Sequence, residues 1–104
     1  MENRRYLCSQ LATLTVDGQA RWVNIEEIWD TGVILESETE VFAGNEASLS
    51  VESASFQGRL SEVRQEEFGW RVEMEFSPET PWAPEQWRPD HLLDPAVLKQ
   101  GGDS

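Results

Sequence analysis

Apolar and polar residues alternate along most of the chain up to residue 76, and turn-forming residues interrupt the alternation at intervals of roughly ten positions. Alternation with a period of two places one set of side chains on the buried face of a sheet and the other set in solvent. The pattern therefore predicts strands, with almost no helix before residue 85. The six predicted strands span residues 6–16, 19–29, 33–35, 47–52, 56–63 and 70–76.

The segment Arg21–Glu36 organises this prediction, because it contains a strand, a turn that closes at Gly32 and a second, short apolar strand. The alternation fails at residues 26–27, so that Ile28 takes the opposite parity to Ile25. A β-bulge at this point restores the inward face. We therefore predict a bulge in the strand that leads into the turn.

This pattern favours an antiparallel barrel, because closure hides the edges that an open six-stranded sheet would expose. Asp17-Gly18 predicts the tight turn of its first hairpin. Beyond residue 76, four of the five prolines lie close together, which excludes a regular strand or a long helix there. Asp90 and Asp94 are candidate caps of short helical pieces. The predicted single all-β domain has a leader (1–10), a barrel (11–76) and a partly helical, Pro- and Trp-rich extension (77–104).

The chain of 104 residues carries a formal net charge of −12, from 20 acidic and 8 basic residues. Such a surface repels nucleic acid and anionic membranes, because both bind clusters of Lys and Arg. One cysteine excludes an internal disulfide, and one histidine leaves no zinc-binding set. The apolar runs are too short to span a membrane and no signal-peptide pattern is present, so the expected location is the cytoplasm.

Candidate catalytic groups are few. Glu26 and Glu27 are adjacent, so a regular strand directs their carboxylates to opposite faces, which does not suit joint acid–base catalysis. Cys8 and His91 are the single thiol and the single imidazole, and nothing in their spacing brings them together. We therefore expect a protein that is not an enzyme and that needs no metal or cofactor.

A family resemblance rests on three features in a fixed order. The pair Arg4-Arg5 precedes the first strand, and a strand–turn unit over residues 27–35 has Gly32 at the end of its turn. Gly58 then precedes a final strand of the form Gly-x-x-Val-x-x-x-Phe over residues 69–76. Together these features resemble the PilZ domain, a small bacterial β-barrel known for binding cyclic di-GMP. The resemblance covers residues 4–76 and implies a six-stranded PilZ-like barrel with a signalling role.

The resemblance also implies a ligand site, built from the family's Arg-x-x-x-Arg and Asp-x-Ser-x-x-Gly motifs. The matching positions are Arg4, Arg5, Ser9, Glu27, Trp29 and Gly32. Ser9 stands where the second arginine belongs, Glu27 replaces the Asp, and Trp29 replaces the Ser. The family uses two guanidinium groups as planar, bidentate donors to phosphate and guanine. These departures predict that cyclic di-GMP binding is weakened or lost.

The tryptophans at positions 29, 82 and 87 leave two alternatives open. Trp29 precedes the turn at Gly32, whereas Trp82 and Trp87 lie in the C-terminal extension. These side chains either pack against the barrel, with the extension as a lid, or form an exposed interface, since Trp is a favoured hot-spot residue.

We predict a non-catalytic PilZ-like regulatory module that acts through contacts with a basic protein partner or with a second copy of itself. One alternative is a functional cyclic di-GMP receptor, in which Arg4 and Arg5 close over the ligand and Glu27 contacts a guanine edge. The other alternative is a structural domain whose only role is to dimerise.

Overall fold

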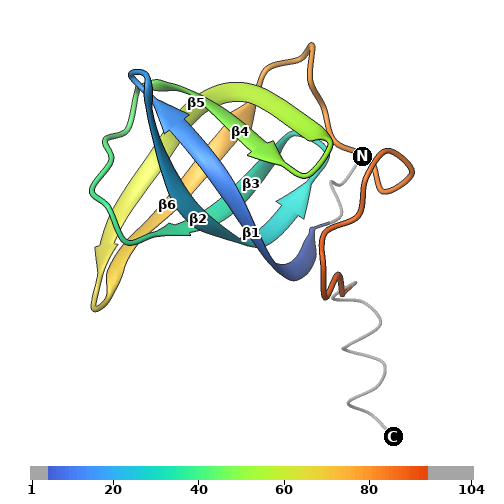
Figure 1. Ribbon diagram of the computed structural model, residues 1–104, viewed down its shortest axis with the longest axis horizontal. Coiled ribbons are helices and arrows are strands. Elements are labelled where there is room, and N and C mark those ends of the chain that lie inside the picture. The colour runs from blue at the N-terminus through green and yellow to red at the C-terminus, as the bar shows by residue number, and fades with distance from the viewer. Residues whose placement is uncertain (1–4, 94–104) are drawn as a thin grey trace, which may run out of the picture.

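The computed structural model describes residues 5–93, which form six antiparallel strands closed into a barrel (Figure 1). Around the barrel the strands follow the order β1, β2, β3, β6, β5, β4, and β4 pairs with β1 to complete the ring. The predicted all-β class and the closed six-stranded barrel are confirmed. The strands are β1 (Tyr6–Val16), β2 (Gln19–Trp29), β3 (Gly32–Ser37), β4 (Glu46–Val51), β5 (Ala54–Glu66) and β6 (Gly69–Phe76).

Two-residue turns connect β1 to β2, β2 to β3, β4 to β5 and β5 to β6. The first is the predicted Asp17-Gly18 turn, in which φ is 54° at Asp17 and 77° at Gly18. Positive φ at both central residues is the geometry of a type I′ turn, whose twist matches that of the paired strands. Such short turns fix the pairing register of each hairpin and hence of the barrel.

The predicted bulge in β2 is present. The register of the β2–β3 ladder shifts between Ile25 and Glu27, so Glu26 is the extra residue. This insertion directs both Ile25 and Ile28 into the barrel, where each side chain is fully buried. Without it, a strict period of two would place one of these isoleucines in solvent.

Each strand end lies within two residues of its predicted position, except the end of β5. Strand β5 continues to Glu66, three residues past the predicted end at residue 63. Residues 64–66 pair with residues 69–71, and the resulting hairpin projects past the neighbouring strands (Figure 1). The three residues are polar because they are exposed, so no apolar alternation marks this part of the strand. Strand β1 matches the predicted strand over residues 6–16, so residues 6–10, which the predicted division also assigns to the leader, are part of the barrel.

Inward-facing side chains from all six strands fill the barrel. Phe56 and Phe76 stack with their ring centroids 4.7 Å apart, which joins β5 to the end of β6. The largest fully buried side chains are those of Leu14, Ile25, Ile28, Leu35, Leu49, Phe56, Leu60 and Met74.

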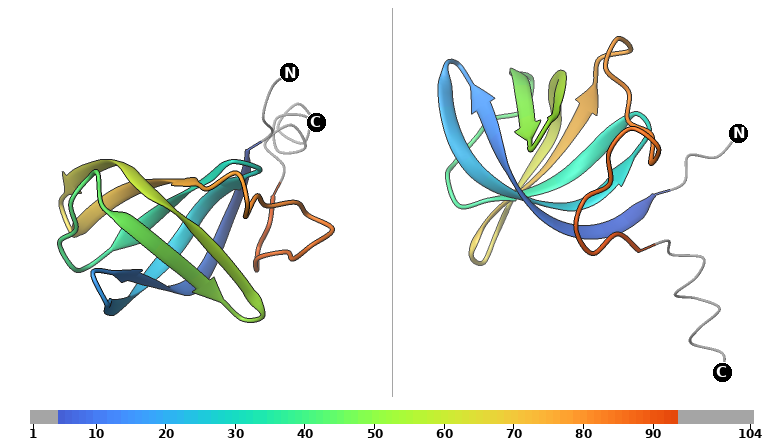
Figure 2. Two further views of the ribbon diagram at one scale, coloured as in Figure 1. Left: turned by 90° about the horizontal axis from the view of Figure 1, so that it is seen from above. Right: turned by 45° about the vertical axis from the view of Figure 1, so that its right-hand side comes forward.

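Residues 77–93, here called the C-terminal strap, run around one end of the barrel (orange to red in Figure 2). β1 pairs with β4 only from Thr13 to Val16, which leaves the first half of β1 without a strand on that side. The strap occupies part of this edge, because Leu7 and Leu93 exchange backbone hydrogen bonds of 2.8 and 2.6 Å.

The described part of the strap contains turns and no helix, and the predicted cap Asp94 lies outside the described residues. Over residues 5–93, no helix is long and apolar enough to cross a membrane.

Candidate functional site

Arg5 and Trp29 meet at the end of the barrel near the strap. The guanidinium carbon of Arg5 lies 3.9 Å from the centroid of the Trp29 ring, the geometry of a cation–π contact. Trp29 itself is only 5% exposed. A Cβ at Gly32 would approach both the Trp29 indole and the carbonyl oxygen of Met74 to 2.8 Å. The missing side chain at Gly32 therefore makes room for the indole.

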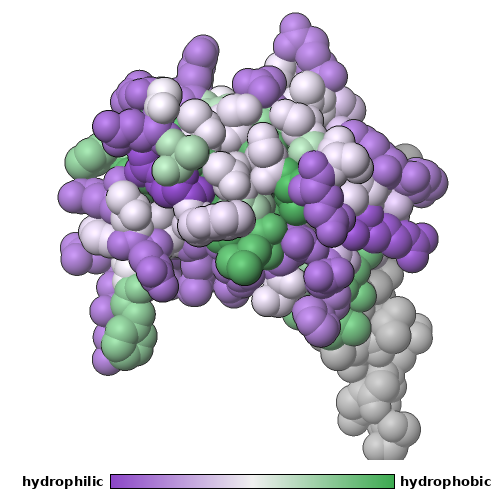
Figure 3. Space-filling view, viewed as in Figure 1, coloured by the Kyte–Doolittle hydropathy of each residue, from purple (hydrophilic) through white to green (hydrophobic). Residues whose placement is uncertain are grey.

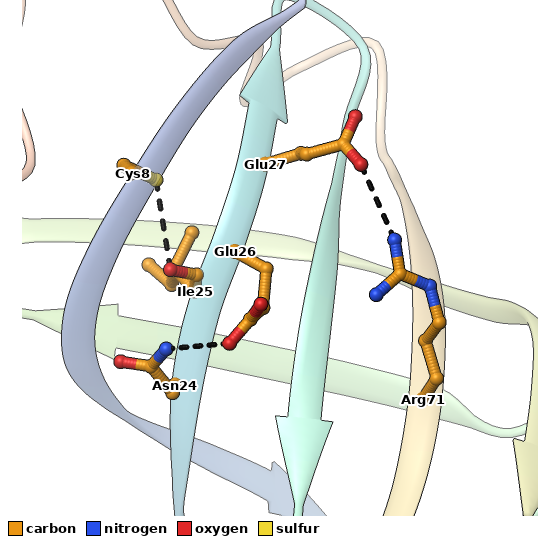
Figure 4. Close-up of polar contacts among 6 residues, drawn as sticks. All are labelled: Cys8, Asn24, Ile25, Glu26, Glu27 and Arg71. Carbon is orange, nitrogen blue, oxygen red and sulfur yellow. Dashed lines mark hydrogen bonds and ion pairs between the residues drawn. The ribbon is translucent and has the colours of Figure 1, made fainter. Parts of the chain in front are cut away.

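Glu27, the carboxylate at the family's Asp position, forms an ion pair with Arg71 of β6 (Figure 4). The distance from Arg71 Nη2 to Glu27 Oε2 is 3.2 Å, and both side chains are partly buried. Because the guanidinium already neutralises the charge of this carboxylate and occupies a hydrogen-bonding position on it, the carboxylate is less available to bind a ligand. No local pattern predicts this pair, because its two residues are 44 positions apart in the chain.

Of the other positions that the PilZ resemblance implies, Ser9 contacts other parts of the chain. The Ser9 hydroxyl donates to Asn24 Oδ1 at 3.4 Å, and the Ser9 backbone N–H donates to the carbonyl of Asp90 in the strap. Arg4 lies outside the described residues. The structure thus brings Arg5, Trp29 and Gly32 together, whereas Glu27 pairs with Arg71 of β6, and Ser9 bonds to Asn24 of β2 and to the strap.

Cys8 lies on β1 beside the bulge and is half-buried (Figure 4). Burial of the thiol, together with the negative charges of Glu26 and Glu27, raises the pKa of Cys8 to about 12. The protonated thiol donates to the carbonyl of Ile25 at 3.6 Å. A thiol held in this form is a poor nucleophile, and among the described contacts it does not pair with His91.

Trp82 and Trp87 close the strap end of the barrel. The Trp82 indole N–H donates to the carbonyl of Trp87 at 2.8 Å, and the Trp87 indole N–H donates to Glu52 Oε1 at 3.0 Å. Trp82 also makes an edge-to-face contact with Tyr6, at 5.6 Å between centroids. Both tryptophans are buried, as is Trp29, so the packed alternative holds and these three residues do not form an exposed patch.

An exposed apolar site lies instead around the β5–β6 hairpin, at the opposite end of the barrel from the strap. Four side chains from β1, β2, β6 and the hairpin tip line a groove of about 630 Å³, here called the aromatic groove: Leu11, Trp22, Phe68 and Trp70. Three of them are largely exposed, with Trp22 at 71% and Phe68 at 88%. Figure 3 shows an apolar side chain at the tip of the projecting hairpin, among polar ones.

Four carboxylates surround the aromatic groove and form an acidic rim: Glu36, Glu38, Glu66 and Glu67. Repulsion from Glu26, followed by a slight desolvation and by repulsion from Glu66, raises the pKa of the exposed Glu36, and Arg71 opposes this effect. Glu26 is itself fixed by a hydrogen bond of 2.8 Å from the Asn24 amide (Figure 4). The rim therefore concentrates negative charge beside exposed rings.

Sequence reasoning missed this groove. Trp22 has the outward parity of β2, opposite to the buried Val23 and Ile25, and this parity is the signal that identifies it as a surface aromatic. Phe68 lies between the predicted strands 56–63 and 70–76, and no pattern there predicts a role for its ring. An exposed aromatic side chain at a hairpin tip does not pack in the hydrophobic core, so its position favours a contact with another molecule.

No protein-family model matches the sequence, and no curated protein is significantly similar to it. Within residues 5–93, no group of three or more His, Cys, Asp or Glu side chains is arranged to hold a metal ion. The candidate site is therefore defined by geometry and charge alone.

Proposed function

We propose that this protein is a non-catalytic regulatory module of the PilZ type that acts through contacts with another protein at the aromatic groove. The observation that carries the proposal is the exposure of Trp22 and Phe68 on the two sides of one groove. Trp is a frequent interface hot spot, and exposed apolar groups gathered at one site of a soluble domain commonly mark an interaction surface.

The positions that resemble the family's ligand motifs support a weakened or lost response to cyclic di-GMP. Arg5 covers the ring of Trp29, and Glu27 is paired with Arg71. A ligand would have to displace both contacts, and Ser9 offers no second guanidinium. The thiol of Cys8, held protonated by its surroundings, supports the absence of nucleophilic catalysis.

Affinity capture from the native host tests the proposed contact. The wild-type protein is compared with a Trp22→Ser, Phe68→Ser double variant and with a Phe42→Ser control, because Phe42 is also exposed but does not line the groove. We expect a specific partner with the wild type and the control, and its loss with the double variant. Equal capture by all three proteins contradicts the proposal.

Calorimetric titration with cyclic di-GMP tests the receptor alternative, in which a ligand would have to displace Arg5 from the ring of Trp29. We expect no binding heat at low or moderate salt. Binding that disappears in an Arg5→Ala variant would support the receptor instead.

A further inference from the structure

The aromatic groove presents its rings from a fixed frame. Trp22 extends from the first half of β2, and Phe68 occupies the tip of the β5–β6 hairpin. Next to Phe68, Gly69 has a φ of 147°, and its backbone approaches the Ser37 carbonyl so closely that no Cβ fits between them. The backbone beside the hairpin tip is therefore held against the end of β3, which fixes the hairpin relative to Trp22 and reduces the ordering that binding requires.

The charge around this groove has one sign. Of the described residues that line it, four are glutamates and none is Lys or Arg. Arg71 is the cation that opposes the repulsion on Glu36, and it is already paired with Glu27. The repulsion that Glu26 and Glu66 exert on Glu36 is only partly offset, so a positive charge placed in the groove relieves it.

Other occupants fit less well. A second copy of the chain also carries a net charge of −12, so two like-charged surfaces repel when they approach. Nucleic acid and anionic lipid have the same sign as the rim. An uncharged apolar segment would cover the rings but leave the carboxylates without partners, at a desolvation cost. Charge complementarity therefore favours a cationic protein segment.

Recognition at this groove proceeds through side chains. The described strands form a closed ring, in which β3 and β6 pair from Gly32 to Ser37. β2 pairs with β3 only from Val23, so residues 19–22 have no strand on that side, and what the groove gathers from several strands is rings and carboxylates. Ring faces attract Lys and Arg by cation–π contacts, and carboxylates bind the same groups by charge-assisted hydrogen bonds.

We propose that the aromatic groove binds a basic, partly apolar segment of a partner protein, with an Arg or Lys side chain placed over Trp22 or Phe68 and between the rim carboxylates. This inference rests on the proposed function and names the chemistry of its partner. Apolar neighbours of the cation cover Leu11 and the remaining ring surface.

Fluorescence anisotropy with defined peptides tests the inference. The probe is a short labelled peptide in which Arg and Leu alternate, and two matched peptides carry Glu in place of Arg or Ser in place of Leu. We expect the Arg–Leu peptide to bind, the Glu peptide not to bind, and the affinity to fall as salt is raised, because the contact is partly electrostatic.

Variants separate the groove from the overall charge. Trp22→Ser is expected to weaken binding by about tenfold, because it removes a cation–π contact together with the apolar surface of the indole. Glu36→Gln with Glu66→Gln is compared with Glu46→Gln plus Glu85→Gln, a control pair that removes the same charge away from the groove. A clearly larger loss with the rim pair supports the inference, and equal losses overturn it.

Failure of this inference is distinguishable from failure of the proposed function. If the Arg–Leu peptide does not bind but Trp22→Ser, Phe68→Ser still abolishes partner capture, the groove is an interface and its partner is not basic. If neither peptide binding nor capture depends on Trp22 and Phe68, both proposals are refuted.

Discussion

Replacing Trp82 with alanine removes the side chain that anchors the C-terminal strap to the barrel. Trp82 is 2% exposed, makes an edge-to-face contact with Tyr6 and donates its indole N–H to the Trp87 carbonyl. Truncation of a buried aromatic to Ala costs about 3–5 kcal/mol. The carbonyl of Trp87 also loses its donor, and a lost hydrogen bond of this kind contributes about 0.5–1.5 kcal/mol within that range. We therefore expect the free energy of unfolding to fall by about 4 kcal/mol.

Urea denaturation followed by far-ultraviolet circular dichroism measures this loss without depending on tryptophan fluorescence. The matched control is Trp22→Ala, because Trp22 is 71% exposed and its removal is expected to change stability by less than about 0.5 kcal/mol. The slope of the unfolding free energy with urea should stay unchanged if the barrel remains intact. Equal, small effects of the two substitutions would refute the interpretation of the strap as part of the fold.

Three further predictions concern single residues. Cys8 in the folded protein should react with iodoacetamide at pH 8 far more slowly than in the urea-unfolded protein, and equal reaction rates would contradict this. Because the folded-state pKa of Cys8 is raised from 9.0 to about 12, the free energy of unfolding should fall as pH rises through that interval. Glu36→Gln should stabilise the fold at pH 7, because the raised pKa of Glu36 means that its ionised form is disfavoured in the folded state. This gain in stability should disappear below about pH 4, and a pH-independent difference in thermal unfolding would argue against repulsion of Glu36 by its neighbours. Gly32→Ala should lower the free energy of unfolding by roughly 1–3 kcal/mol, because the new Cβ meets Trp29 and a backbone carbonyl; unchanged stability in urea would show that the indole has room to move.

Much of the barrel follows from local physical rules that the sequence displays. The Asp17-Gly18 turn has the residues that positive φ requires, and the change of parity between Ile25 and Ile28 predicts the bulge, since only an inserted residue buries both. The end of β5 does not follow from them, because Arg64, Gln65 and Glu66 are exposed and show no alternation.

The candidate site was less predictable because its contacts join distant parts of the chain. The pairing of Glu27 with Arg71 depends on β6 lying beside β3, and burial of Trp82 depends on the path of the strap. A tryptophan in a Pro-rich segment carries no local mark of burial or exposure. By contrast, the outward parity of Trp22 in β2 is a local signal of exposure, and it points to the aromatic groove.

Site-specific photo-crosslinking from position 68 tests the central claim most directly. A photoreactive phenylalanine analogue replaces Phe68 at the hairpin tip, and the same analogue at Phe42 serves as the control, since both rings are exposed. In cells of the native host, we predict one dominant crosslinked protein from position 68, with the link in a basic segment, and none from position 42. The same products from both positions, or none from position 68, would contradict the account.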